Sequence, residues 1–229
     1  MIRTVARTGS TNDDVADLVR DGAPEGTWLR AERQTGGKGR QGRAWVSPAG
    51  NLYASTLVRL RAGDPPAPTL ALVAAVALHE VVAIYAPATQ IKWPNDLLFG
   101  GAKLAGILLE RQDEAVVVGF GVNLARQPEG LDRPATSLSA LSGMAPEPGP
   151  LTEILARNFS RWLARWRQEG FAPVRAAWLG AAHPVGTPLS TSLGEGLFDG
   201  LGPSGALRLR LPDGRCRLIH AGDVFPGTV

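Results

Sequence analysis

Apolar side chains recur at helical spacing between residues 151 and 168, and they predict a helix that buries one face. The apolar positions of this stretch are Ile154, Leu155, Phe159, Trp162, Leu163 and Trp166. A second helix is expected at 69–85, in the most apolar part of the chain. His79 and Glu80 interrupt that apolar run, so the sequence predicts a core helix there and not a membrane span.

Short runs of alternating or apolar residues predict strands. Before the long helix they lie at 27–33, 51–60, 90–92, 97–99, 102–110 and 115–122. Ser10 and Thr11, followed by three short polar residues, predict the start of a further helix that runs to about Arg20. After about Pro184 the pattern changes to short alternating segments joined by turns such as 212–214, which reads Pro-Asp-Gly.

These elements predict an α+β fold in which helices flank a mixed sheet, followed by a small all-β module. The mixed catalytic or binding domain is expected to span residues 1–183, and a small C-terminal β-barrel is expected to span residues 184–229. A length of 229 residues suits this division into one large domain and a small appendage.

Composition narrows the class of protein only a little. Lys and Arg total 24 against 21 Asp and Glu, and the net charge of +3 is too small to indicate a nucleic-acid binder. Cys216 is the only cysteine, so no intramolecular disulfide can form and nothing indicates an oxidising compartment. Residues 1–14 lack the apolar core of a signal peptide, and a cytoplasmic location is therefore expected.

The richest segment for chemistry runs from Gln34 to Trp45. Residues 36–45 contain four glycines and three cations and end in a tryptophan. Glycine lets backbone N–H groups approach an anion, Lys and Arg supply charge for phosphate or carboxylate, and tryptophan can stack on a flat ring. The segment matches G-x-G-x-x-G, but Pro48 and Gly50 follow where a dinucleotide-binding motif requires a helix. The segment suits a nucleotide with a charged acyl group, and a solvated flexible loop stays open as the alternative.

Three further segments carry candidate chemistry. Lys92 to Leu97 places a cation, an amide and a carboxylate around a proline, which suits Mg²⁺ with polyphosphate oxygens or is simply a tight turn. Lys103 opens an otherwise apolar strand, where a lysine is costly unless it is paired, used or extended to the surface. Asn123 follows the strand 115–122, where it either caps the strand or reaches a ligand.

Taken together, these segments resemble the biotin–protein ligase family. They are Ser10-Thr11-Asn12, Gln34 through Trp45, Lys92 through Leu97, Lys103 through Glu110 and Gly119 through Asn123. They follow in the family's order and spacing, over nearly the whole chain. The resemblance implies the catalytic fold of biotin and lipoate ligases with a C-terminal SH3-like barrel. It also implies that biotin carboxylate attacks the α-phosphate of ATP to give biotinyl-5′-AMP, and that a lysine of a biotin carboxyl carrier protein then takes the biotinyl group.

The same resemblance assigns site residues by position. Biotin would be bound by Ser10, Thr11, Asn12, Gln34, Gly37, Lys38, Gly39, Arg40, Lys103 and Gly106. ATP and the adenylate would be bound by Arg40, Arg43, Trp45, Asn95, Asp96, Lys103 and Asn123. Lys103 and Arg40 would be the catalytic residues, and Asn95 and Asp96 would serve Mg²⁺ through the triphosphate. Lys38 stands where an arginine is common in the family, which keeps the charge but loses the bidentate fork.

Two other functions are kept as alternatives. A lipoate– or octanoate–protein ligase shares the fold and the carrier-lysine chemistry, but the segments 34–45 and 92–96 favour biotin. A non-catalytic nucleic-acid-binding module would use the C-terminal barrel, in which Phe198 and Phe225 are the only aromatic residues. Only nine residues precede the Ser-Thr-Asn segment, so the DNA-binding domain that some family members carry there is not expected, and neither is a membrane partner.

Overall fold

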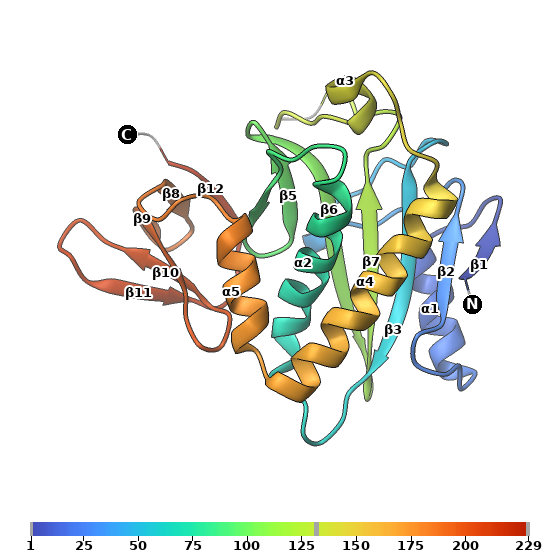
Figure 1. The fold of residues 1–229 in the computed structure, drawn as a ribbon, viewed down its shortest axis with the longest axis horizontal. Helices are drawn as coiled ribbons and strands as arrows, with labels where there is room; N and C mark the ends of the chain where they lie inside the picture. The colour runs from blue at the N-terminus through green and yellow to red at the C-terminus, as the bar shows by residue number, and fades with distance from the viewer. Residues whose placement is uncertain (1, 131–132, 228–229) are drawn as a thin grey trace.

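A seven-stranded mixed sheet forms the centre of the computed structural model, which describes residues 2–130 and 133–227 (Figure 1). The strands are β1 (Ile2–Val5), β2 (Trp28–Ala31), β3 (Leu52–Arg59), β4 (Gln90–Lys92), β5 (Asp96–Phe99), β6 (Ala102–Gln112) and β7 (Ala115–Val122). They lie in the order β1-β2-β3-β7-β6-β5-β4, with β1 parallel to β2 and the other neighbours antiparallel. The predicted mixed sheet is thus confirmed, although the four residues of β1 are too few to show a strand pattern in the sequence.

Helices cover both faces of this sheet (Figure 1). α1 (Thr11–Arg20) lies on one face, and α2 (Leu70–Val82) and α4 (Pro148–Glu169) lie on the other; α5 (Ala172–Ala181) packs against α2 and α4, and the short α3 (Leu138–Ser142) lies at one end of the sheet. Alternation along β7 decides which helices each side chain meets, because Val116 and Val118 join the core under α2 and α4 whereas Val117 packs with α1. The helices predicted at 69–85 and 151–168 are confirmed. None of the helices in the described part of the chain has the length and apolar character needed to span a membrane.

The C-terminal segment forms a second, five-stranded antiparallel sheet, seen beside α5 in Figure 1. Its strands are β8 (Pro188–Thr191), β9 (Gly194–Leu201), β10 (Leu207–Arg210), β11 (Cys216–Ile219) and β12 (Val224–Pro226), in the order β11-β10-β9-β8-β12. This sheet agrees with the predicted SH3-like barrel. Phe198 of β9 packs against Trp178 of α5, with ring centroids 6.3 Å apart. The second sheet therefore shares its core with the rest of the chain, and the division at residues 183 and 184 stays a prediction.

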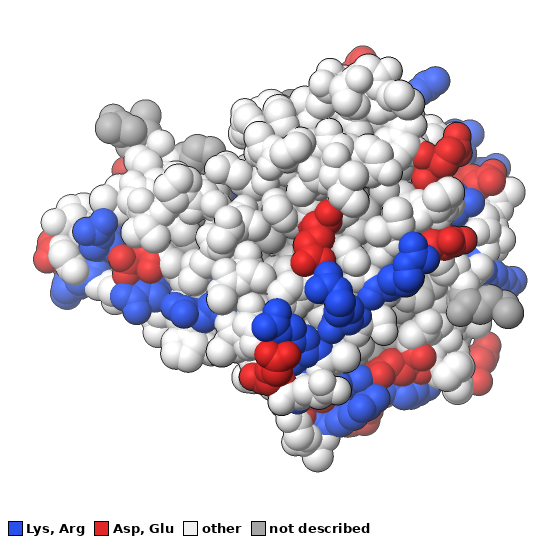
Figure 2. All heavy atoms as spheres, viewed as in Figure 1, with Lys and Arg blue, Asp and Glu red and all other residues white. Residues whose placement is uncertain are grey.

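The outer face of α4 is solvated, and several of its charges are paired. Arg161 forms an ion pair with Glu80 of α2, and Arg165 pairs with Glu169 one turn further along α4. Figure 2 shows these mixed charges as a diagonal stripe, with a second mixed group over the β10–β11 hairpin. Exposed pairs of this kind contribute little to stability, about 0–1 kcal/mol each. The candidate chemistry lies instead on the face of the sheet that α1 covers.

Candidate functional site

A pocket of about 550 Å³ lies where five parts of the chain meet: the start of α1, the loop 36–47, strands β5 to β7, the segment between β7 and α3, and the turn before β12. The predicted site residues that line it are Ser10, Thr11, Asn12, Gln34, Lys38, Gly39, Arg40, Arg43, Trp45, Asn95, Asp96, Lys103, Gly106 and Asn123. The fold thus gathers into one cavity residues that are up to 113 positions apart, from Ser10 to Asn123. Residues that the sequence reasoning did not assign also line the pocket, among them Arg133 and Asp223.

Gly37 is the one predicted site residue that does not line the pocket. A Cβ atom at Gly37 would lie 2.5 Å from the Trp45 carbonyl oxygen and 2.6 Å from Ser47 Oγ. Its carbonyl also accepts a hydrogen bond of 2.8 Å from the Trp45 backbone N–H. Gly37 therefore lets the two ends of the loop cross closely, and its predicted contact with biotin stays a prediction.

Two glycines form a flat floor under Trp45. Gly106 of β6 and Gly121 of β7 lie opposite each other in the sheet. A Cβ atom at Gly121 would lie 2.6 Å from the Trp45 ring, and one at Gly106 would lie 3.0 Å from it. The indole therefore rests directly on the sheet, and Lys103 Nζ lies 5.3 Å from the centroid of its ring, within reach of a cation–π interaction.

The deep end of the pocket is a cluster of buried, uncharged polar groups. Gln34 Oε1 accepts a hydrogen bond of 2.8 Å from the backbone N–H of Thr11 and lies 3.2 Å from the Thr11 hydroxyl oxygen. Thr11 Oγ1 and Asn12 Oδ1 each lie 2.7 Å from the hydroxyl of Ser55, a fully buried residue of β3. Ser10, the N-cap residue of α1, makes no capping bond with its side chain, so its hydroxyl is available to a ligand. Donors and acceptors stand side by side here, as recognition of an amide-like or urea-like group requires.

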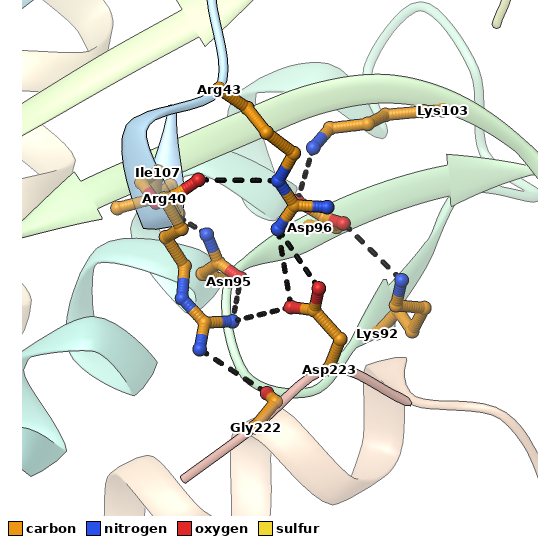
Figure 3. A network of polar contacts seen from close by, with 9 residues as sticks. All are labelled: Arg40, Arg43, Lys92, Asn95, Asp96, Lys103, Ile107, Gly222 and Asp223. Carbon is orange, nitrogen blue, oxygen red and sulfur yellow. Dashed lines mark hydrogen bonds and ion pairs between the residues drawn. The ribbon is translucent and has the colours of Figure 1, made fainter. Parts of the chain in front are cut away.

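An acidic residue links two lysines at the wall of the pocket (Figure 3). Asp96 Oδ2 accepts from Lys92 Nζ at 3.3 Å, and Asp96 Oδ1 lies 2.7 Å from Lys103 Nζ. Burial alone would raise the pKa of Asp96, but the ammonium groups of Lys103 and Lys92 outweigh it, so this pKa lies below its ordinary value. Burial lowers the pKa of Lys92, although the Asp96 carboxylate opposes that effect. The ion pair with Asp96 therefore offsets the free-energy cost of placing Lys103 in an otherwise apolar strand.

The second sheet contributes a carboxylate to the mouth of the pocket (Figure 3). Asp223 Oδ2 lies 2.9 Å from Arg43 Nη2, and Asp223 Oδ1 lies 3.4 Å from Arg40 Nη1. Arg40 also donates to the Gly222 carbonyl at 3.2 Å and to Asn95 Oδ1 at 3.2 Å. The arginines of the loop are therefore held between two distant parts of the chain. No local sequence pattern marks Asp223, which is 180 residues from Arg43.

Asn123 joins the end of β7 to the segment that follows the undescribed residues 131 and 132. Its amide NH₂ donates to the Thr136 carbonyl at 3.1 Å, and its backbone N–H donates to Leu104 at 3.0 Å. The neighbouring Arg133 also lines the pocket, with its guanidinium 4.1 Å from the ring centroid of Phe225. These hydrogen bonds support the interpretation that Asn123 caps the strand. Contact of Asn123 with a ligand stays a prediction.

The described lining residues carry more positive than negative charge. The cations are Lys38, Arg40, Arg43, Lys103 and Arg133, and the anions are Asp96 and Asp223. Five cations and two carboxylates give these lining residues a net charge of +3. A pocket with this balance favours a polyanionic ligand at the mouth, next to the neutral polar cluster at the deep end.

The chain is similar to known protein ligases in both sequence and structure. The Biotin/lipoate A/B protein ligase family matches residues 4–124. Over 240 aligned residues the chain is 41% identical to a biotin–[acetyl-CoA-carboxylase] ligase of Paracoccus denitrificans, with 97% of this chain and 99% of that protein covered. It is 34% identical to the corresponding ligase of Mycobacterium tuberculosis, covering 96% of this chain and 86% of that one. The structure of Aquifex aeolicus biotin protein ligase in complex with biotin and ATP superposes with a TM-score of 0.89, at 25% identity, and 99% of each chain is covered.

Proposed function

The chain belongs to the Biotin/lipoate A/B protein ligase family, and from this premise we propose that it is an ATP-dependent biotin–protein ligase. It activates biotin as biotinyl-5′-AMP and transfers the biotinyl group to a lysine of a biotin carboxyl carrier protein. The observation that carries the proposal is the single cavity that joins a neutral polar end to a mouth rich in cations. Biotin has the matching two ends, a neutral ureido ring and a carboxylate that must meet a triphosphate.

The reaction has two steps, and each makes one bond while breaking another. In the first, a carboxylate oxygen of biotin bonds to the α-phosphorus of ATP, and the bond to the bridging oxygen breaks, so pyrophosphate leaves with the electron pair. In the second, a neutral lysine amine of the carrier bonds to the carbonyl carbon of the mixed anhydride. The C–O bond to AMP then breaks, and the amine loses its extra proton.

Lys103 would act where the two anions meet. Its ammonium lies between the Trp45 ring and Asp96, at the wall that faces the loop arginines. In the first step Lys103 would exchange Asp96 for the biotin carboxylate and the α-phosphate, where negative charge gathers in the transition state. A fixed charge of this kind typically contributes about 10²- to 10³-fold in rate.

Arg40 and Arg43 would bind the phosphates and close the loop over the intermediate. Both guanidinium groups already lie beside an anionic partner, the carboxylate of Asp223. A mixed anhydride hydrolyses in water, so a loop that excludes solvent protects it until the acceptor lysine arrives.

Mg²⁺ would enter with the triphosphate. Among the described residues no cluster of three or more His, Cys, Asp or Glu side chains could hold a metal alone. Asn95 and Asp96 supply one amide oxygen and one carboxylate at the pocket wall, and Mg²⁺ is commonly held by one or two carboxylates together with substrate phosphates. Those two residues fit the ion in that shared arrangement, in which the metal neutralises phosphate charge.

The neutral deep end favours biotin over the alternatives. Ser10, Thr11 and Gln34 offer hydroxyl and amide groups to the ureido ring, whereas the dithiolane of lipoate or the chain of an octanoyl group would leave them unpaired at a cost of about 1–3 kcal/mol each. Nucleic-acid binding is disfavoured because two of the four arginines of the β10–β11 hairpin are already paired, Arg208 with Asp199 and Arg215 with Asp213. We place the enzyme in the cytoplasm, where ATP is available as its substrate.

The test is to incubate the protein with ATP, Mg²⁺, biotin and a biotin carrier domain and to weigh the carrier by mass spectrometry. The expected result is a gain of one biotinyl group, which disappears when the acceptor lysine of the carrier is replaced. A gain with lipoate or an octanoyl donor, and none with biotin, would move the chain to the other branch of the family. No gain with any acyl donor would leave the proposal without support.

A further inference from the structure

A chain of hydrogen bonds leads from the deep end of the pocket to a glutamate that the mechanism above does not use. Thr11 Oγ1 and Asn12 Oδ1 each lie 2.7 Å from Ser55 Oγ. Asn12 Nδ2 donates a hydrogen bond of 2.7 Å to Glu110 Oε2 on β6. Ser55 is fully buried, and Thr11 and Asn12 are nearly so, so bulk water does not complete these bonds.

Only one direction of donation satisfies this chain. A carboxylate accepts hydrogen bonds and cannot donate them, so the Asn12 amide turns its NH₂ group to Glu110 and its oxygen to Ser55. The amide oxygen carries no proton, so the Ser55 hydroxyl must donate to it. Ser55 Oγ is then left as an acceptor, and the proton between the two hydroxyl oxygens must come from Thr11.

Gln34 is the other acceptor within reach of the Thr11 proton. Its Oε1 lies 3.2 Å from Thr11 Oγ1, farther than Ser55, and it already accepts from the Thr11 backbone N–H at 2.8 Å. Donation to Gln34 would leave two hydroxyl oxygens facing each other at 2.7 Å with no proton between them. The Thr11 proton is therefore committed to Ser55, and Thr11 presents a lone pair to the pocket.

We propose that Glu110 is a positioning residue that makes the Thr11 hydroxyl an acceptor for an N–H group of the ligand. It acts through Asn12 and Ser55 and does not touch the ligand itself. The inference rests on the proposed function, because the ureido ring of biotin offers an N–H group beside its carbonyl. Ser10, whose hydroxyl can donate, suits that carbonyl.

The backbone around Asn12 supports this assignment independently. Gly119 of β7 pairs with Leu108, two residues from Glu110 on β6, and a Cβ atom at Gly119 would lie 2.1 Å from Asn12 Oδ1. The strand thus leaves space for the amide in the orientation that the chain requires. A side chain at this position would push the amide oxygen away from Ser55.

Without Glu110, the direction of donation along the hydrogen bonds that join Asn12, Ser55 and Thr11 is no longer fixed. Without a carboxylate to meet, the Asn12 amide can rotate by half a turn and donate its NH₂ group to Ser55. The Ser55 hydroxyl then donates to Thr11, and Thr11 turns its own proton toward the pocket. A donor would face the ligand N–H, which is a clash of like groups in place of a hydrogen bond.

The test is calorimetric titration of biotin into the unmodified protein and into Glu110→Ala, Glu110→Gln and Ser55→Ala. We expect Glu110→Ala to raise the Kd for biotin by about tenfold, the usual effect of losing one well-made hydrogen bond. Glu110→Gln keeps an oxygen for Asn12 but can itself flip, so an intermediate rise of about threefold is expected. The matched control is Glu153→Gln on the exposed face of α4, with an expected change of less than about twofold.

A second measurement separates positioning from simple loss of structure. The KM for ATP and the melting temperature should stay close to those of the unmodified protein in Glu110→Ala, and the preference for biotin over its cyclic carbamate analogues, in which a ring oxygen replaces one ureido N–H, should narrow. An unchanged Kd for biotin in Glu110→Ala would overturn the inference, and so would a parallel loss of biotin and ATP affinity. If the unmodified protein bound no biotin, the proposed function itself would fail, and this inference would fail with it.

Discussion

The two ends of the pocket are built in opposite ways. At the deep end, Ser10, Thr11 and Asn12 are only 3%, 4% and 5% exposed, and hydrogen bonds hold the side chains of Thr11 and Asn12. At the mouth, the side chains of Arg43 and Lys103 are 48% and 36% exposed, and ion pairs hold them. Buried neutral networks fix one geometry, because any unpaired group there is costly, whereas half-exposed charges exchange partners readily and are screened by salt.

This contrast matches the two demands on the proposed enzyme. The ring of biotin must be distinguished from other acyl groups, which calls for a fixed donor and acceptor pattern. The phosphates must enter, react and leave as pyrophosphate and AMP, which calls for charges that can change partners. The C-terminal sheet reaches only the mouth, through Asp223, so it should affect the nucleotide more than the ring of biotin.

The largest expected effect is at the mouth, from Lys103→Ala. We expect the rate of adenylate formation to fall by about 10²- to 10³-fold, because a charge aimed at the developing negative charge is lost. The affinity for biotin in the absence of ATP should change little, since the neutral cluster is intact. Single-turnover release of pyrophosphate measures the first quantity, and calorimetry the second. Adenylate formation at a near-normal rate would contradict the role given to Lys103.

At the deep end, Gly119→Ala should weaken the binding of biotin more than it changes the KM for ATP, the reverse of the pattern expected for Lys103→Ala. The new Cβ would lie 2.1 Å from Asn12 Oδ1, so the amide must move and the hydrogen bonds of Ser55 must break. We expect a loss of about 1–3 kcal/mol in the free energy of unfolding, as for an overpacked core, and a rise of about tenfold in the Kd for biotin. Denaturant titration and calorimetry measure the two changes.

The matched control for that substitution is Gly63→Ala, since a Cβ atom at Gly63 meets nothing within 4 Å and its backbone is not in the left-handed region. Gly63→Ala should leave both the free energy of unfolding and the Kd for biotin near their original values. If Gly119→Ala raised the KM for ATP as much as the Kd for biotin, the separation of the two ends would be wrong.

Asp223→Asn tests how far the second sheet acts on the mouth. The carboxylate holds Arg43 at 2.9 Å and Arg40 at 3.4 Å, so its loss should leave both arginines less well placed for phosphate. Partly exposed pairs are worth about 0.2–1 kcal/mol, and we therefore expect the KM for ATP to rise by about two- to fivefold with an unchanged Kd for biotin. Steady-state kinetics at low and high salt give the measurement, because salt should reduce the difference. A lower KM would instead identify Asp223 as a competitor for the phosphate site.

The residues that sequence reasoning could and could not find follow the same division. The loop 36–45 and the segment 92–97 are contiguous, and unusual residue types in a row predict chemistry before any fold is known. Asp223 and Glu110 each make their key contact across a long separation, 180 residues to Arg43 and 98 residues to Asn12, and neither stands in a local pattern that points to its partner. Such contacts depend on the register of the sheets, which side-chain periodicity does not specify.

Hydrophobic patterning was sufficient for the long helices and for most strands, including the short β4 and β5, and insufficient for β1 and α5. The helix at 151–168 shows five turns of apolar repeats, and the structure places α4 over it. The four residues of β1 and the helix α5, which has a proline in its first turn, carry weaker local signals and depend on the core that they complete. The pattern also does not reveal the role of Ser55. A serine in an alternating strand resembles a solvent-facing residue, and only the packing of the start of α1 onto the strand shows that Ser55 is hydrogen-bonded there.

The smallest expected effect is that of Lys38→Ala, at the edge between the two ends. Lys38 is one of the three cations of the loop 36–45, but its ammonium pairs with Asp13 at the start of α1, and both side chains are about half exposed. Such a pair contributes at most about 1 kcal/mol, so the Kd for biotin and the KM for ATP should each change by less than about fivefold. Lys38→Arg, which keeps the charge, should be closer still to the unmodified protein. A loss in the rate of adenylate formation comparable with that of Lys103→Ala would mean that Lys38 leaves Asp13 and contacts the ligand during the reaction. The cations that exchange partners would then include Lys38 as well as those at the mouth.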